Sequence, residues 1–286
     1  MAADLHGKTC VITGATSGIG RSTARALAAA GARVGIVARD RQRAEETVAE
    51  IRAATGNSAL DVFLADLAVQ AEVRRVAGEI LARYSQLHVL INNAGVVNLS
   101  YSTTPDGIET VFAVNHLAYF LLTNLLLERL RASAPARIVN VASDAHKFAR
   151  QIDFDDLGHQ ATYSARTSMQ IYGHSKLANI LFTYELARRL AGSGVTVNCV
   201  HPGAVATRLG QNNGRVATLL TKLLAPFFRS PERGAATSVW LATAPELAEV
   251  TGKYFMNCRE GRSSRYSHDL GGAQRLWDVS ARLVGM

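Results

Sequence analysis

Two polar residues four positions apart, Tyr172 and Lys176, form the pair in this chain best suited to acid–base chemistry. They begin a stretch with apolar residues at helical spacing, which predicts an amphipathic helix from residue 171 to about residue 190. Residues four apart are neighbours on a helix surface, so the phenol and the ammonium point the same way. A phenol has a pKa of about 10, and a cation within about 4–6 Å lowers it by about 1–3 units. The spacing therefore fits a proton donor, although an exposed helical pair without chemistry has the same pattern.

Length and composition indicate a globular protein with a full core. The chain has 286 residues, which allows one or two domains, with 48% hydrophobic residues and a mean hydropathy of +0.06. The net charge is +8, but the basic residues are scattered and form no dense run, so we expect no nucleic-acid partner.

Cysteines and apolar runs bear on the compartment. The three cysteines, Cys10, Cys199 and Cys258, are far apart and lack metal-ligand spacing. We therefore expect free thiols, no metal site and a cytoplasmic location. The longest apolar run, residues 117–127, is shorter than the about 20 residues that cross a bilayer, so we expect no membrane span.

Short apolar runs rich in β-branched residues alternate with helical segments, and this alternation predicts the fold. The predicted strands are residues 9–13, 33–38, 60–64, 89–91, 137–141, 195–200 and 253–256. One predicted helix ends near residue 30, and others span about residues 41–54, 69–84 and 171–190. Residues 105–130 are predicted to form either one long helix or two merged pieces, and a further helix follows Pro231. Strands that alternate with such helices form a parallel α/β sheet with helices on both faces.

Ligands of such sheets bind beyond the carboxyl ends of the strands, so functional residues should follow strands. Polar or glycine-rich segments do follow the first six predicted strands: Gly14–Gly20, Arg39, Asp66, Asn92–Gly95, Ser143 and His201–Gly203. The first of them, Gly14-x-x-x-Gly18-x-Gly20, fits the generic dinucleotide motif only loosely. Glycines there allow a tight turn and close approach of a pyrophosphate to a helix N-terminus. An ordinary glycine-rich turn is the alternative, but the position after the first strand favours phosphate binding.

Together these motifs resemble a known family. Thr13-Gly14-x-x-x-Gly18-Ile19-Gly20, Asn92–Gly95, Asn115, Ser143, Tyr172-x-x-x-Lys176 and Pro202-Gly203 occur in the order seen in short-chain dehydrogenases/reductases. The resemblance covers about residues 7–205. Residues 137–141, 174–182 and 201–203 are most similar to the retinol dehydrogenase-like branch. Membrane-bound members of that branch carry an N-terminal anchor that is not found here, so the resemblance implies a soluble relative.

The resemblance implies a single Rossmann-type domain, with a cofactor half at about 7–140 and a catalytic and substrate part at about 141–286. It implies that Tyr172 is the general acid or base, that Lys176 lowers the tyrosine pKa and holds the nicotinamide ribose, that Ser143 binds the reacting oxygen and that Asn115 holds a water. The implied cofactor-binding residues are Gly14, Thr16, Ser17, Gly18, Ile19, Gly20, Arg39, Asp66, Leu67, Asn93, Ala94, Gly95, Tyr172, Lys176, Pro202, Gly203, Val205 and Thr207.

The end of the second strand bears on the cofactor. By resemblance, Ala38 stands where an NAD-specific relative holds an acid, and Arg39 can pair with a 2′-phosphate. Asp40 complicates this, but we expect it to cap the helix at 41–54. NADP(H) is therefore expected, with NAD as the second choice.

Two further segments bear on the substrate. The stretch between Ser143 and Tyr172 either shapes substrate entry or is an ordinary surface loop. By position, residues 204–231 resemble the substrate lid of the family, and their apolar side chains suggest an apolar substrate, although they could simply pack on the body. The resemblance also implies a homodimer or homotetramer assembled through helices 105–130 and 171–190. We expect an oxidoreductase that interconverts an apolar carbonyl and an alcohol; the alternative is a non-catalytic dinucleotide-binding or redox-sensing protein.

Overall fold

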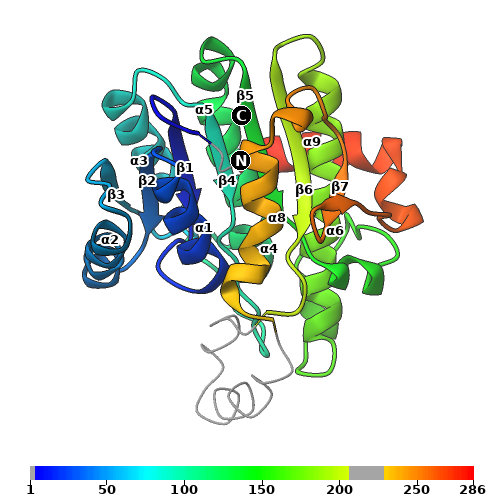
Figure 1. Cartoon of the computed structure of the whole chain (residues 1–286). Coiled ribbons are helices and arrows are strands. Elements are labelled where there is room, and N and C mark those ends of the chain that lie inside the picture. Colours follow the sequence, from blue (N-terminus) through cyan, green and yellow to red (C-terminus); the bar gives the residue numbers. More distant parts are fainter. Residues whose placement is uncertain (1–3, 206–228) are drawn as a thin grey trace.

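One mixed α/β sheet organises the molecule (Figure 1). The computed structural model describes residues 4–205 and 229–286. Its strands have the order β3-β2-β1-β4-β5-β6-β7-β8, in which β1 to β7 pair in parallel and β8 is antiparallel to β7. The strands are β1 (Thr9–Thr13), β2 (Arg33–Ala38), β3 (Leu60–Leu64), β4 (Val89–Asn92), β5 (Ala136–Val141), β6 (Val195–His201), β7 (Tyr254–Met256) and β8 (Arg259–Glu260).

Helices cover both faces of the sheet. Those of the described residues are α1 (Gly18–Ala29), α2 (Arg41–Thr55), α3 (Gln70–Arg83), α4 (Thr110–Phe112), α5 (Ala118–Ala132), α6 (Ser168–Arg189), α8 (Pro231–Thr243) and α9 (Leu270–Leu283). The predicted α/β fold with a doubly wound parallel sheet is confirmed. All seven predicted strands occur, and the eighth is a two-residue exposed strand with no apolar signal.

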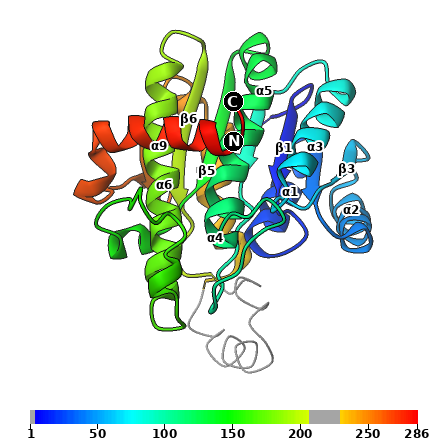
Figure 2. The ribbon, with the colours of Figure 1, turned by 180° about the vertical axis from the view of Figure 1, so that it is seen from behind.

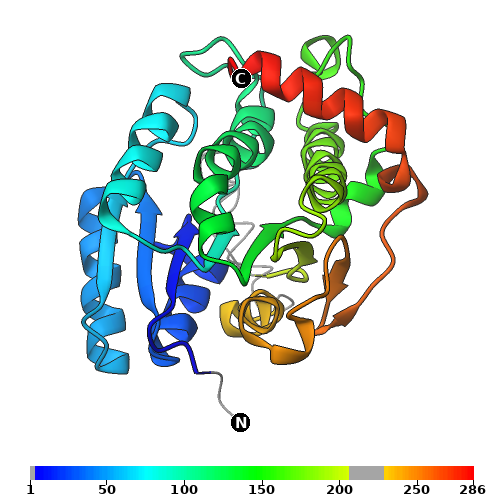
Figure 3. The same cartoon turned by 90° about the horizontal axis from the view of Figure 1, so that it is seen from above.

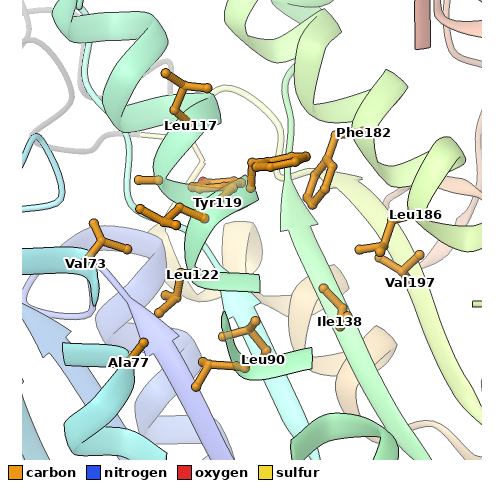
Figure 4. Close-up of a cluster of buried hydrophobic side chains, with 14 of the residues drawn as sticks. Val73, Ala77, Leu90, Leu117, Tyr119, Leu122, Ile138, Phe182, Leu186 and Val197 are labelled. Atoms are coloured by element: carbon orange, nitrogen blue, oxygen red, sulfur yellow. The ribbon is translucent and has the colours of Figure 1, made fainter. Parts of the chain in front are cut away.

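Neighbouring residues of each strand enter different cores, as the two-residue period of a strand requires. Val11, Leu90, Ile138 and Val197 pack with side chains of α3, α5, α6 and α9. Figure 4 shows Leu90, Ile138 and Val197 in this core. Cys10, Ile12, Ile36 and Val139 pack on the other side with α1, α2 and α8. Because both faces are covered, the strands read as continuous apolar runs, which is why the sequence revealed them.

The segment predicted as helical at 105–130 begins at Thr110 and runs to Ala132, with a π-helical turn at Ala113–Leu117. This helix is long and apolar enough to cross a membrane by length and composition, with a mean hydropathy of 1.5. The uninterrupted apolar run at residues 117–127 therefore underestimated the length of this apolar helix. However, 78% of the relevant window is buried inside the protein, which is the pattern of a core helix.

The sequence did not predict α9, because Gly271 and Gly272 lie in its first turn and glycine disfavours helices. The Asp269 side chain accepts a hydrogen bond from the Gly272 N–H (3.0 Å) and caps the helix. Figures 2 and 3 show α9 crossing the outer side of α5 and α6. Trp277 of α9 packs against Phe120 and Phe182, with ring centroids 4.9 and 5.8 Å apart.

Candidate active site

A cavity of about 1460 Å³ lies at the carboxyl edge of the strands. The strand order reverses between β1 and β4, and such a switch point is where α/β sheets bind ligands. Among the described residues, these predicted site residues line the cavity: Gly14, Thr16, Ser17, Ile19, Gly20, Arg39, Asp66, Leu67, Asn93, Ala94, Gly95, Ser143, Tyr172, Lys176, Pro202, Gly203 and Val205. Gly18 and Asn115 are not among the lining residues. Thr207 and residues 206–228 of the expected lid lie outside the described residues.

The glycine-rich loop after β1 packs tightly against the segment after β4. Gly14 has a φ of +68°, and a Cβ placed on it would lie 2.8 Å from the Cα of Ala94. A Cβ on Gly20 would lie 2.3 Å from the carbonyl oxygen of Gly14. The side-chain Nδ2 of Asn93 donates to the carbonyl oxygen of Thr13 (2.8 Å). Backbone therefore forms this wall of the cavity, as a bound pyrophosphate requires.

The N-terminus of α1 is open toward the cavity. Ser17 is the N-cap, yet within the described residues its side chain makes no capping hydrogen bond. The first N–H groups of a helix have no partner within it and attract anions. This end of α1 therefore fits a phosphate group, as the sequence predicted.

Arginines gather where β2 ends. Arg39 is exposed and lines the cavity, as predicted, and Arg43 one turn further lines it too. Asp40 caps α2 by accepting a hydrogen bond from the Arg43 N–H (3.0 Å), which confirms the capping role expected for it. Arg43 was not among the predicted site residues.

Asp66 lines the cavity after β3. Its Oδ1 accepts a hydrogen bond from the Ala68 N–H (2.9 Å), so Asp66 also stabilises the turn before α3. The N-cap of α3 itself is Val69. Asp66 therefore both lines the cavity and stabilises the turn before α3.

The reacting end of the cavity brings Tyr172 and Lys176 of α6 next to Ser143, which follows β5. The Lys176 Nζ donates to the carbonyl oxygen of Val141 (2.9 Å) and lies 5.5 Å from the centroid of the Tyr172 ring. Ser143 and Tyr172 both line this end of the cavity, and interaction with the Ser143 side chain acts to lower the pKa of Tyr172. The Ser143 Oγ accepts from the Ala145 N–H (3.2 Å), which leaves the hydroxyl proton of Ser143 for another partner.

The pKa of Tyr172 differs from the expected direction. Burial raises the pKa of Tyr172 to about 12, while its interaction with the Ser143 side chain acts in the opposite direction. Burial also lowers the pKa of Lys176 to about 7. The expectation that Lys176 lowers the tyrosine pKa below its ordinary value is wrong for this structure, because it took no account of burial. Both residues are almost fully buried, which disfavours the charged form of each.

Asn115 occupies the π-helical turn at Ala113–Leu117. Its Nδ2 donates to the Val96 carbonyl (3.0 Å) and to the Ser175 Oγ (3.0 Å), and its Oδ1 accepts from the Val96 N–H (2.8 Å). The side chain therefore fixes the segment after β4 to α6. The water-holding role of Asn115 stays a prediction.

Apolar side chains line the cavity beside the reacting end, and the sequence analysis did not place them there. These residues are Val96, Val114, Phe148 and Met169. Phe148 comes from the stretch between Ser143 and Tyr172, whereas Phe154 of the same stretch packs against the core. That stretch therefore contributes one side chain to the cavity lining and another to the core. Among the described residues, no group of three or more histidine, cysteine or acidic side chains could hold a metal ion.

Comparison with known proteins agrees with this site. The family model for short chain dehydrogenases matches residues 8–154 and 157–216. The chain therefore belongs to the short-chain dehydrogenase family. It is 49% identical to retinol dehydrogenase 12 of Mus musculus over 99% of this chain and 88% of that protein. It is 45% identical to retinol dehydrogenase 13 of Homo sapiens, over 99% of this chain and 86% of that protein.

Solved structures show the same fold. A crystal structure of an uncharacterized protein from Mycobacterium paratuberculosis superposes with a TM-score of 0.80 at 33% identity, covering 100% of this chain and 96% of that one. A short-chain dehydrogenase from Burkholderia cenocepacia in complex with NADP has a TM-score of 0.69 at 29% identity, covering 88% and 96%. The chain is thus an oxidoreductase of alcohol and carbonyl groups that uses a nicotinamide dinucleotide.

Proposed function

We propose that this protein is an NADP(H)-dependent oxidoreductase that interconverts an apolar ketone or aldehyde and the corresponding alcohol. The observation that carries the proposal is the cavity itself. Tyr172 and Ser143 line one end, and the cations Arg39 and Arg43 line the other. The retinol dehydrogenases it resembles are named for an apolar alcohol, which supports an apolar substrate.

The residues present fit a dinucleotide along the whole cavity. The glycine loop and the open N-terminus of α1 would hold the pyrophosphate, and Lys176 would hold the nicotinamide ribose. Arg39 and Arg43 would bind the 2′-phosphate that distinguishes NADP from NAD. The bound dinucleotide supplies the hydride chemistry. NADP is bound in the Burkholderia relative, and NADH is bound in a 3-ketoacyl-(acyl-carrier-protein) reductase from Brucella melitensis. Because relatives bind either cofactor, the proposed preference for NADP over NAD rests on the two arginines.

The protein's own side chains would donate the proton in carbonyl reduction and accept it in alcohol oxidation. In carbonyl reduction, the Tyr172 hydroxyl donates its proton to the carbonyl oxygen, and the Ser143 hydroxyl donates a hydrogen bond to the same oxygen. The raised tyrosine pKa means that the phenol keeps its proton at neutral pH and is ready as an acid. In alcohol oxidation the same tyrosine must first lose that proton, which its raised pKa opposes. Asn115 and its water remain a proposed route for replacing the proton.

Turnover tests the proposal directly. NADPH is mixed with a panel of ketones and aldehydes that differ in apolar chain length, and the loss of reduced-nicotinamide absorbance is followed. We expect turnover that rises with apolar length, because Val96, Val114, Phe148 and Met169 line the cavity. NADPH binding without any turnover, and without a change in Tyr172→Phe, would favour the non-catalytic alternative.

Assembly and location stay predictions. The outer side of α5 and α6, through which a homodimer or homotetramer is expected, carries α9 in this chain (Figure 3). A second copy that approaches there would meet α9 first. A cytoplasmic location and the lack of a membrane or nucleic-acid partner are likewise proposals.

A further inference from the structure

A buried histidine holds the turn that carries Ser143. His146 lies in the 3₁₀ turn Asp144–Phe148 and is 0% exposed. Its Nδ1 lies 2.6 Å from the carbonyl oxygen of Ser143, and its Nε2 lies 2.9 Å from the backbone nitrogen of Ser264. A carbonyl only accepts and a backbone N–H only donates, so both bonds require a neutral ring with its proton on Nδ1. Burial lowers the pKa of His146, which favours this neutral form.

The turn is also held from the strands beside it. The Tyr254 hydroxyl of β7 donates to the Asp144 Oδ1 (2.9 Å), and its ring lies against the His146 ring with centroids 5.3 Å apart. The Asp144 N–H donates to Nδ1 of His201, the last residue of β6 (3.1 Å). Groups that lie more than fifty positions away in the chain therefore fix the residues just after Ser143.

The opposite side of the turn presses on the catalytic helix. A Cβ on Gly173 of α6 would lie 2.4 Å from the carbonyl oxygen of Ala145. Gly173 directly follows Tyr172, so the turn contacts α6 at the residue next to Tyr172. A small shift of the turn would therefore change the position of the Ser143 hydroxyl relative to Tyr172.

We propose that His146 is a positioning residue for Ser143: its Nδ1–H holds the Ser143 carbonyl, and so directs the Ser143 hydroxyl at the reacting oxygen. The inference rests on the proposed function, because it requires Ser143 to bind that oxygen. The backbone N–H of His146 also donates to the Ser143 carbonyl (3.1 Å), so the ring supplies the second of two bonds. Misplacing a catalytic group by about 1 Å can cost about a hundredfold in rate.

Two substitutions separate the two bonds of the ring. In His146→Asn the amide can still donate to the Ser143 carbonyl but cannot reach Ser264. In His146→Gln the longer side chain can accept from the Ser264 N–H, and its donation to Ser143 is lost. We expect His146→Gln to lower kcat about tenfold or more and His146→Asn to stay within about threefold of the wild type, with unchanged NADPH affinity in both.

Repeating His146→Gln in the Ser143→Ala variant shows whether His146 affects kcat through the Ser143 hydroxyl. Once the hydroxyl is gone, His146→Gln should change the residual kcat by less than about twofold, because coupled residues are not additive. An equal loss in both backgrounds, or a wild-type kcat in His146→Gln, would overturn the inference. If His146→Gln does not fold, Tyr254→Phe replaces it in both backgrounds, with the same pattern expected at about threefold.

A second buried histidine provides a matched control. His88 is 6% exposed and accepts a hydrogen bond from the Thr9 N–H through its Nδ1 (3.1 Å), at the amino end of β4. His88→Gln should lower stability and leave kcat unchanged. Failure of the proposed function has a different signature, namely no turnover by the wild type or full turnover by Ser143→Ala.

Discussion

The two ends of the cavity are built from different kinds of groups: backbone atoms and exposed cations at one end, and buried side chains at the other. At the dinucleotide end, backbone atoms of the glycine loop form the wall, and two charged side chains reach it, Arg39 from just after β2 and Arg43 from the first turn of α2. At the reacting end, side chains form the site, and Tyr172 and Lys176 are only 7% and 2% exposed.

This contrast decides how each end works. Charges at an exposed site act by attraction and are screened by salt. Charges at a buried site are costly, so burial moves the pKa of Tyr172 upward and that of Lys176 downward. Selectivity at the first end should therefore depend on ionic strength, and chemistry at the second should depend on pH.

The largest effect is expected at the reacting end. Tyr172→Phe removes the proton donor and keeps the ring, which packs with Val97, Val111 and Ala145. We expect kcat to fall by about 10²–10⁴-fold with NADPH affinity nearly unchanged. Steady-state turnover and a fluorescence titration of NADPH measure the two quantities. A loss of less than about tenfold would contradict the role of Tyr172.

The glycine loop should tolerate no side chain at its closest contact. Gly20→Ala would place a Cβ 2.3 Å from the Gly14 carbonyl oxygen and 2.5 Å from the Asn93 Nδ2. We expect the free energy of unfolding to fall by about 1–3 kcal/mol, measured by urea denaturation.

The control for that substitution is Gly78→Ala. Gly78 is exposed on α3, and a Cβ there would meet nothing within 4 Å. Alanine is the better helix former, so this variant should gain about 0.5–1 kcal/mol. Equal effects of the two substitutions would show that the loop is not tightly packed.

The buried lysine predicts a stability that depends on pH in the cofactor-free protein. Lys176 has a pKa of about 7 when folded against an ordinary value of 10.5. Between these values the unfolded chain binds more protons, so the contribution of Lys176 makes stability rise with pH. From pH 7 to pH 9 the gain should be about 2 kcal/mol larger in the wild type than in Lys176→Met. Other groups titrate in both proteins and cancel in this difference. Parallel pH profiles of the two proteins would mean that the lysine is not desolvated.

The smallest effect is expected at the exposed end. Arg39→Ala should lower the preference for NADPH over NADH about five- to tenfold, because one cation is lost from the proposed 2′-phosphate site. The effect should shrink at high salt. Arg41→Ala is the matched control, since Arg41 lies between Arg39 and Arg43 in the sequence and does not line the cavity. If the NADPH to NADH ratio of Arg39→Ala equals that of Arg41→Ala, the account of cofactor preference is wrong.

The same contrast explains what the sequence could predict. Buried parallel strands appear as apolar runs, and the residues that follow them must meet at one edge, so the fold and most of the cavity lining could be predicted. Arg43 was missed because an arginine in the first turn of an exposed helix has no distinctive pattern. The pKa of Tyr172 was expected in the wrong direction because helical spacing carries no information on burial. His146 contacts Ser264, and no local pattern signals a contact between positions so distant in the chain.

The position of α9 has a consequence for how the protein forms during synthesis. Leu276 and Val284 belong to the same core as Phe120 and Phe182, yet they are made about a hundred residues or more after them. Until residues 270–284 have emerged, the aromatic side chains of α5 and α6 lack their cover. Nascent chains that stall before α9 should therefore be the species that chaperones recognise and that aggregate first.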